Sequence, residues 1–165
     1  MVTKHIADRF VKTRLFPGQQ VSARRGFQPV RQTYNFRAHQ DHCMYLFPIP
    51  AFADNYFWLL HDGKRALVVD PGAAEPVLRA LQQHALQLES ILVTHHHADH
   101  TGGVDALRQA TGARVYGPAT ERIAQPFTPL REGDVVRALD LDCQGLEVPG
   151  QTAGPIALYA PVRNA

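Results

Sequence analysis

Residues 94–103 carry the side chains with the clearest capacity for chemistry. Within Thr-His-His-His-Ala-Asp-His-Thr-Gly-Gly, four potential metal ligands occupy six positions: His95, His97, Asp99 and His100. Imidazole nitrogens and a carboxylate oxygen are donors that zinc, iron or manganese accepts in proteins. A single histidine is more often solvated or hydrogen-bonded in a core, but four ligand-type residues at this spacing predict a metal site. Two histidines two residues apart can bind one ion, and the last two ligands can face a second.

The elements around this loop are those that a metal site needs. A buried apolar strand at residues 91–93 runs directly into the loop, and a helix at residues 104–110 follows it. In α/β proteins, sites are usually built at the carboxyl ends of strands. Gly102 and Gly103 allow the backbone to turn sharply beneath the ligands. We expect His96 to point away from the ligands and to have a structural role.

Strands and helices alternate along the rest of this part of the chain. Apolar runs predict strands at 45–49, 55–60, 65–69, 114–116 and 145–148, and the helical spacing after Pro76 predicts a helix. Pro48 indicates an edge position for the first strand. Asn55, Tyr56 and Trp58 are expected to be strand and core residues rather than substrate contacts. The alternation predicts an α/β fold with βαβ units.

The composition of the 165 residues, with 45% hydrophobic and 19% charged side chains, is typical of a globular domain. No apolar run approaches the roughly 18 residues that span a membrane, and no signal peptide is recognisable. The two cysteines, Cys43 and Cys143, form no C-x-x-C pair. Cysteine usage therefore favours a cytoplasmic protein without a membrane anchor.

The first 43 residues differ from the rest in charge and pattern. They hold eight Lys/Arg against two Asp/Glu, a net charge of +6, whereas the remainder holds nine against thirteen, a net charge of −4. We predict a basic, poorly ordered N-terminal extension at 1–43 and a folded domain at 44–165. Residues 1–43 are either an upstream extension of a chain whose original start is Met44, or a targeting or interaction tail. No nucleic-acid-binding motif accompanies the scattered basic residues.

Two segments together carry a resemblance to a known family. The loop at 94–103 resembles the His-x-His-x-Asp-His motif of the metallo-β-lactamase superfamily. Residues 46–58, Leu-Phe-Pro-Ile-Pro-Ala-Phe-Ala-Asp-Asn-Tyr-Phe-Trp, resemble the N-terminus of the glyoxalase II (hydroxyacylglutathione hydrolase) family. Val-Asp-Pro-Gly at 69–72 and Glu-Val-Pro-Gly at 147–150 also match in order and spacing. The resemblance covers about residues 44–160.

The resemblance implies an αββα sandwich that holds two metal ions, usually zinc. It implies hydrolysis of an S-2-hydroxyacylglutathione to a 2-hydroxy acid and glutathione, the thioester step of methylglyoxal detoxification. His95 and His97 would bind the first ion, and Asp99 and His100 the second. Asp99 would also help to position the metal-bound hydroxide. Asp70 would support the ligand loop, although a plain turn residue before Pro-Gly is an equal alternative.

The chain departs from the family pattern at Gln151, where the family has a third histidine for the first ion. A carboxamide is a poor zinc ligand, so Gln151 is a degenerate ligand position. We expect the chain to hold the first half to two-thirds of the sandwich, without the glutathione-binding helical domain. We also expect the strand at 156–160 to need a neighbour from outside the chain, and an exposed sheet edge to permit self-association.

Two other functions fit the same residues. One is a non-enzymatic metal-binding or interaction protein that pairs with a partner chain. The other is a different hydrolase of the superfamily or a persulfide dioxygenase, against which the opening at 48–56 argues.

Overall fold

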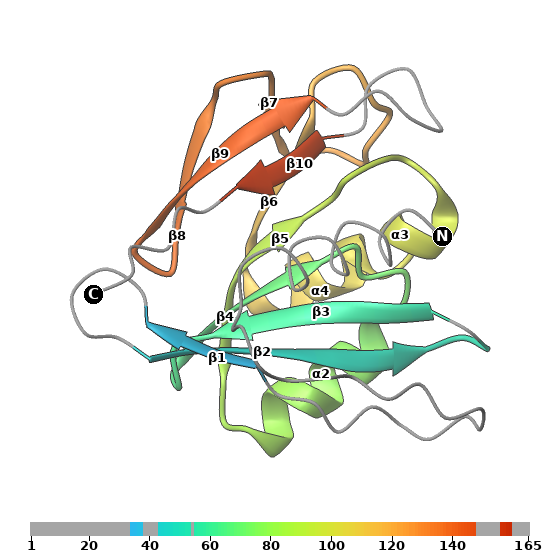
Figure 1. Ribbon diagram of the computed structural model, residues 1–165. Coiled ribbons are helices and arrows are strands. Elements are labelled where there is room, and N and C mark those ends of the chain that lie inside the picture. Colours follow the sequence, from blue (N-terminus) through green and yellow to red (C-terminus); the bar gives the residue numbers. More distant parts are fainter. Residues whose placement is uncertain (1–33, 38–42, 54, 148–155, 160–165) are drawn as a thin grey trace, which may run out of the picture.

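The computed structural model describes residues 34–37, 43–53, 55–147 and 156–159, which form two β-sheets and a layer of helices (Figure 1). The large sheet has seven strands in chain order: β1 (Tyr34–Arg37), β2 (Cys43–Ala51), β3 (Asn55–His61), β4 (Arg65–Val69), β5 (Gln87–Leu92), β6 (Arg114–Pro118) and β7 (Thr128–Leu130). The small sheet has the order β10-β9-β8, with β8 at Val135–Ala138, β9 at Leu141–Glu147 and β10 at Ile156–Tyr159. The helices of the described residues are α2 (Ala74–Gln83), α3 (Ala98–Thr101) and α4 (Val104–Thr111).

The strands of the large sheet change from antiparallel to parallel at β4. Neighbours from β1 to β4 are antiparallel, whereas β4, β5, β6 and β7 are parallel to one another. Parallel neighbours need a crossover connection. The connection from β4 to β5 contains α2, and that from β5 to β6 contains α3 and α4. The carboxyl ends of β4, β5 and β6 therefore meet at one edge of the sheet.

Helices α2 and α4 cover one face of the large sheet. Successive strand residues point to opposite faces, so Ala66 and Val68 of β4 point toward the helices. They belong to one core cluster with Val77 of α2 and Leu107 of α4, all of them fully or almost fully buried. Burial of each large aliphatic side chain contributes about 1.5–3 kcal/mol. This cluster fixes α4, and with it the loop that enters the helix.

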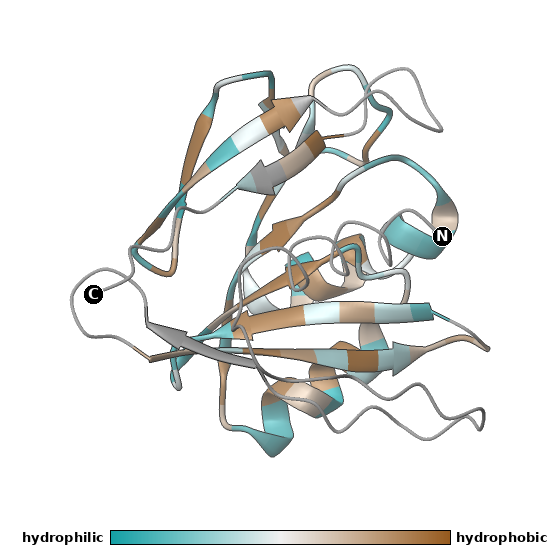
Figure 2. Cartoon of the chain, viewed as in Figure 1, coloured by the Kyte–Doolittle hydropathy of each residue, from teal (hydrophilic) through white to brown (hydrophobic). Residues whose placement is uncertain are grey.

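The small sheet covers the opposite face. Leu67 and Leu92 of the large sheet share a second buried cluster with Val136, Leu141 and Ile156 of the small sheet. Figure 2 shows hydrophobic residues along β5 and β8, on the two sides of this interface. The order is helix layer, large sheet, small sheet, which are three of the four layers of an αββα sandwich. A second helix layer is not found among the described residues.

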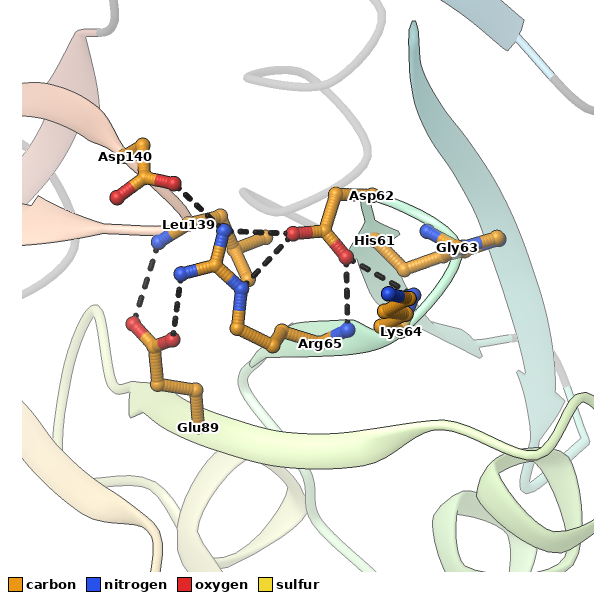
Figure 3. A network of polar contacts seen from close by, with 8 residues as sticks. All are labelled: His61, Asp62, Gly63, Lys64, Arg65, Glu89, Leu139 and Asp140. Atoms are coloured by element: carbon orange, nitrogen blue, oxygen red, sulfur yellow. Dashed lines mark hydrogen bonds and ion pairs between the residues drawn. The ribbon is translucent and has the colours of Figure 1, made fainter. Parts of the chain in front are cut away.

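A network of charged side chains ties the two sheets together at the start of β4 (Figure 3). The Arg65 guanidinium contacts Asp62 and Asp140 at 2.7 Å each, and Glu89 at 3.5 Å. Glu89 also accepts the backbone N–H of Leu139 at 3.2 Å. Leu139 and Asp140 form the turn between β8 and β9, so Arg65 links this turn to the large sheet. The network lies at the amino end of β4, whereas Asp70 follows its carboxyl end.

The structure corrects two expectations about strand neighbours. The strand at 45–49 was expected at an edge, but β2 lies between β1 and β3. Pro48, which lacks a backbone N–H, is nevertheless without a described neighbour on the β1 side, because β1 pairs only with residues 43–46 of β2. The strand at 156–160 was expected to need an outside neighbour, but β10 pairs with β9 of the same chain, Ile156 opposite Glu147.

The structure describes residues 34–37 and Cys43 of the expected N-terminal extension at 1–43. Residues 34–37 form β1 and are hydrogen-bonded to β2, so this part of the segment at 1–43 belongs to the large sheet. Residues 1–33 and 38–42 lie outside the described residues, as does Gln151. Among the described residues, no helix combines the length and apolarity needed to cross a membrane.

Candidate metal centre

The turn after β4 and the loop after β5 interlock at the carboxyl edge of the large sheet. The backbone N–H of Gly103 donates to the carbonyl oxygen of Pro71 at 2.8 Å. A Cβ atom on Gly72 would lie 2.0 Å from the carbonyl oxygen of Asp99. Only a glycine permits this approach of two backbones. The Asp-Pro-Gly turn is therefore the surface on which residues 98–103 are held.

Asp70 is directed from this turn into the interior. The residue is 1% exposed and has a φ of 51°, a left-handed conformation that aspartate tolerates better than most residues. Its Oδ1 accepts the backbone N–H of Thr94 at 2.7 Å, and its Oδ2 accepts the Thr94 hydroxyl at 2.7 Å. Asp70 thus holds the first residue of the histidine loop by two hydrogen bonds. These are the contacts that the loop-supporting interpretation of Asp70 requires.

Thr94 extends this arrangement to His95. The Thr94 hydroxyl donates to Asp70, so its oxygen is left to accept from Nδ1 of His95, which lies 2.9 Å away. A proton on Nδ1 leaves the lone pair of Nε2 for a metal ion. Burial lowers the pKa of His95, and the neighbouring His100 lowers it further, against the opposite influence of Asp70. A lowered pKa favours the neutral form of the ring, which is the form that binds metals.

His100 is arranged in the same way. It is 3% exposed, and its Nδ1 lies 3.1 Å from Oδ2 of Asp70. A carboxylate that accepts the Nδ1 proton orients the ring and leaves Nε2 for a metal, as in many metal sites. Nε2 lies 3.2 Å from Oδ2 of Asp99. Two donors about 2.1 Å from a tetrahedral ion lie about 3.4 Å apart, so these two atoms have the spacing of two ligands on one ion.

The contact between Nε2 of His100 and Oδ2 of Asp99 indicates that these residues fit a metal ion. In the tautomer whose Nδ1 proton is directed to Asp70, Nε2 of His100 and the Asp99 carboxylate are both acceptors. Two acceptors at 3.2 Å require a proton or a cation between them. The ring centroids of His95 and His100 are 4.0 Å apart, and those of His95 and His97 are 4.6 Å apart. The donor set is that of a zinc, iron or manganese site.

The four predicted ligands are all near one another, but they differ in exposure. His95 and His100 are buried and, with Asp70, each offer a ligand atom within 4.8 Å of the others. His97 is exposed, and the Asp99 side chain is 53% exposed. Two buried and two accessible ligands place the site at the surface of the protein, where a substrate can reach it.

Two neighbours of the ligands complete the description. Thr94 stands beside His95 in the motif, but its residue type and spacing alone predict no role for it. Its contact to Asp70, 24 residues away, is visible only in the fold. The Nδ1 of His96 contacts Glu121, and the His96 ring lies 5.0 Å from that of His97, measured between ring centroids.

Comparisons with known proteins agree with this fold. Residues 52–162 match the family described as the metallo-β-lactamase superfamily. The chain belongs to this superfamily. The B3 metallo-β-lactamase BLEG-1 is similar with a TM-score of 0.59 and 24% identity, over 70% of this chain and 66% of its own. TTHA1623, solved in a di-iron-bound form, is similar with a TM-score of 0.57 and 28% identity, over 68% of this chain and 66% of its own.

Several curated proteins, which share one name, are more similar to this chain in sequence than these two solved structures are. A hydroxyacylglutathione hydrolase of Albidiferax ferrireducens is 60% identical over 116 residues, which are 70% of this chain and 46% of the relative. A hydroxyacylglutathione hydrolase of Methylobacillus flagellatus is 53% identical over 116 residues, 69% of this chain and 46% of the relative. The chain spans about half the length of these curated relatives.

Proposed function

We propose that the chain provides the metal-binding loop of a hydroxyacylglutathione hydrolase, which cleaves an S-2-hydroxyacylglutathione thioester with water. The observation that carries this proposal is the pair of buried histidines whose Nδ1 atoms face Thr94 and Asp70. The 60% identity to a relative of that name supports the substrate class.

Zinc is the metal that we propose, with iron or manganese as alternatives for the same donors. TTHA1623, with 28% identity, was solved with two irons, which supports a test of iron beside zinc. Cys43 and Cys143 are free thiols, in keeping with the cytoplasmic location that we propose. His95 and His97 would hold the first ion, and Asp99 and His100 the second.

A bound metal ion supplies Lewis acidity, which polarises the thioester carbonyl and acidifies a water molecule. The residues of the chain have separate tasks around it. Asp70 and Thr94 fix the protons of His100 and His95 on Nδ1, so both Nε2 atoms face the site. The accessible carboxylate of Asp99 accepts a hydrogen bond from the attacking water and orients it toward the carbonyl. The glutathione thiolate is the leaving group, and the acyl part leaves as a 2-hydroxy acid.

The test is hydrolysis of S-lactoylglutathione by the zinc-loaded chain, followed by release of the glutathione thiol. We expect turnover that disappears on addition of a chelator and in the His95→Ala variant. A zinc-loaded wild-type sample that hydrolyses no faster than buffer would contradict the proposal.

A second candidate is a metal-binding protein without hydrolase activity, which pairs with a partner chain. Gln151 favours it, because a carboxamide replaces an imidazole where the family places a ligand of the first ion. Two results together would favour this candidate: retention of zinc without turnover, and a size-exclusion elution volume smaller than that of a monomer of this chain. Turnover by a monodisperse monomer would exclude it.

A further inference from the structure

A buried carboxylate outside the predicted ligand set contacts the histidine loop. Glu121 lies in the loop that follows β6, and its side chain is 4% exposed. Its Oε2 accepts the backbone N–H of His96 at 3.2 Å and also contacts Nδ1 of the His96 ring. A carboxylate removed from water is costly unless hydrogen bonds compensate it. Glu121 therefore makes two contacts with one residue of the metal loop.

The loop that carries Glu121 is held in place by its neighbours. Ile123 is 7% exposed and packs so close to β6 that a Cβ atom on Gly117 would lie 2.3 Å from its Cδ1. On the other side, the Arg108 guanidinium of α4 donates to the carbonyl oxygen of Pro126 at 2.7 Å. The backbone N–H of Glu121 itself donates to Pro118 at 3.2 Å. The carboxylate is therefore presented from a fixed position.

The contact bears on the two histidines that flank His96. His97, the residue after His96, has an extended backbone, with φ of −61° and ψ of 145°. A carboxylate that binds both the N–H and the ring of His96 fixes the peptide between residues 95 and 96. The ring of His97 lies next to those of both neighbours, with its centroid 4.6 Å from that of His95 and 5.0 Å from that of His96.

We propose that Glu121 is a positioning residue of the metal centre, which holds His96 so that His95 and His97 converge on one divalent ion. Without Glu121 the loop would sample other conformations, and binding would have to restore the productive one. This inference rests on the proposed function, because it assumes that His95 and His97 bind metal. Groups that orient metal ligands in this way typically change affinity by about 10–100-fold.

The experiment is a zinc titration of the full chain against a chromophoric chelator, at a temperature where circular dichroism shows every variant folded. We expect Glu121→Ala to weaken zinc binding by about 10–100-fold. Glu121→Gln keeps one acceptor oxygen and should lose less. His96→Ala should also lose less than Glu121→Ala, because the backbone N–H still binds Glu121. The double variant should equal Glu121→Ala. Glu75→Ala, which removes a surface partner of Arg79 on α2, is the matched control and should bind as the wild type does.

The readouts separate positioning from general stabilisation. Loss of global stability does not change the affinity of a chain that remains folded. A fall in affinity that merely follows the unfolded fraction in urea would therefore overturn the inference. In cobalt-loaded samples, the visible absorption bands should change in Glu121→Ala but not in Glu75→Ala. Equal zinc affinity of Glu121→Ala, Glu121→Gln and wild type would overturn the inference alone. A wild-type chain that binds no zinc would instead overturn the proposed function together with it.

Discussion

Asp70→Asn tests the hydrogen-bond arrangement behind the metal centre with almost no change in shape. Asparagine tolerates the left-handed φ of 51° at this position, so the backbone should not be strained. The variant can keep the oxygen that accepts the backbone N–H of Thr94. It replaces Oδ2, which faces the Thr94 hydroxyl and Nδ1 of His100, by an NH₂ group that can only donate.

The consequence falls on His100. Nδ1 must accept from the new NH₂ group, so the proton moves to Nε2, and the lone pair that faces the metal is lost. Loss of such an orienting carboxylate costs about 10–100-fold in metal affinity, equal to about 1.4–2.7 kcal/mol. Hydrogen bonds to a charged group contribute about 1.5–3 kcal/mol each. We therefore expect the free energy of unfolding of the metal-free variant to fall by about 1–3 kcal/mol.

The assay is chelator competition for zinc on folded samples, with urea unfolding of the metal-free chain measured in parallel. Glu75→Gln on the surface of α2 is the control and should change neither quantity, because its carboxylate is 79% exposed. Asp70→Asn with the zinc affinity of the wild type would refute the role that we assign to Asp70 and the tautomer argument for His100.

Three further predictions concern other parts of the fold. Gly72→Ala should weaken zinc binding at least tenfold and lower the free energy of unfolding by about 1–3 kcal/mol, because its Cβ would lie 2.0 Å from the carbonyl oxygen of Asp99. Gly63→Ala is the control, with φ of 96° and no atom within 4 Å of its Cβ. It should lower the free energy of unfolding by about 1 kcal/mol without affecting zinc binding. Arg65→Met should lower the free energy of unfolding by about 1 kcal/mol, since the side chain is 37% exposed. Burial alone would raise the pKa of Asp62, but hydrogen bonds from Arg65 and Lys64 lower it. The stabilisation by the Asp62–Arg65 contact is therefore present above the ordinary pKa of aspartate and is lost as the pH falls below it. Comparison of the acid unfolding curves of wild type and Arg65→Met should show this loss. Burial raises the pKa of Cys143 to about 11. Ellman's reagent at pH 8 should therefore modify exposed Cys43 but reach Cys143 only after unfolding. Rapid modification of both thiols in the native chain would contradict this prediction.

The parts of the structure that sequence predicted are those with a strong local pattern. The strand at 65–69 and the helix at 104–110 were predicted within one residue of β4 and α4, because their apolar spacing is continuous and glycines mark their ends. β7 and β8 were missed, because each has three or four residues, some of them exposed. Short strands of this kind depend on their neighbours more than on their own sequence.

The contacts that organise the metal centre could not be predicted from spacing. Asp70 and Thr94 are 24 residues apart, and His96 and Glu121 are 25 apart. They meet because β4, β5 and β6 are parallel neighbours whose carboxyl ends share one edge. The motif at 94–103 predicts the ligands, whereas the residues that orient them follow from the sheet.

Metal content per chain, measured by mass spectrometry after dialysis against zinc and then against metal-free buffer, tests the central claim most directly. The wild-type chain should retain zinc, and the His95→Ala and His100→Ala variants should lose it while circular dichroism shows them folded. A wild-type chain that retains no metal, or variants that retain as much zinc as the wild type, would contradict the assignment of residues 94–103 as a metal centre.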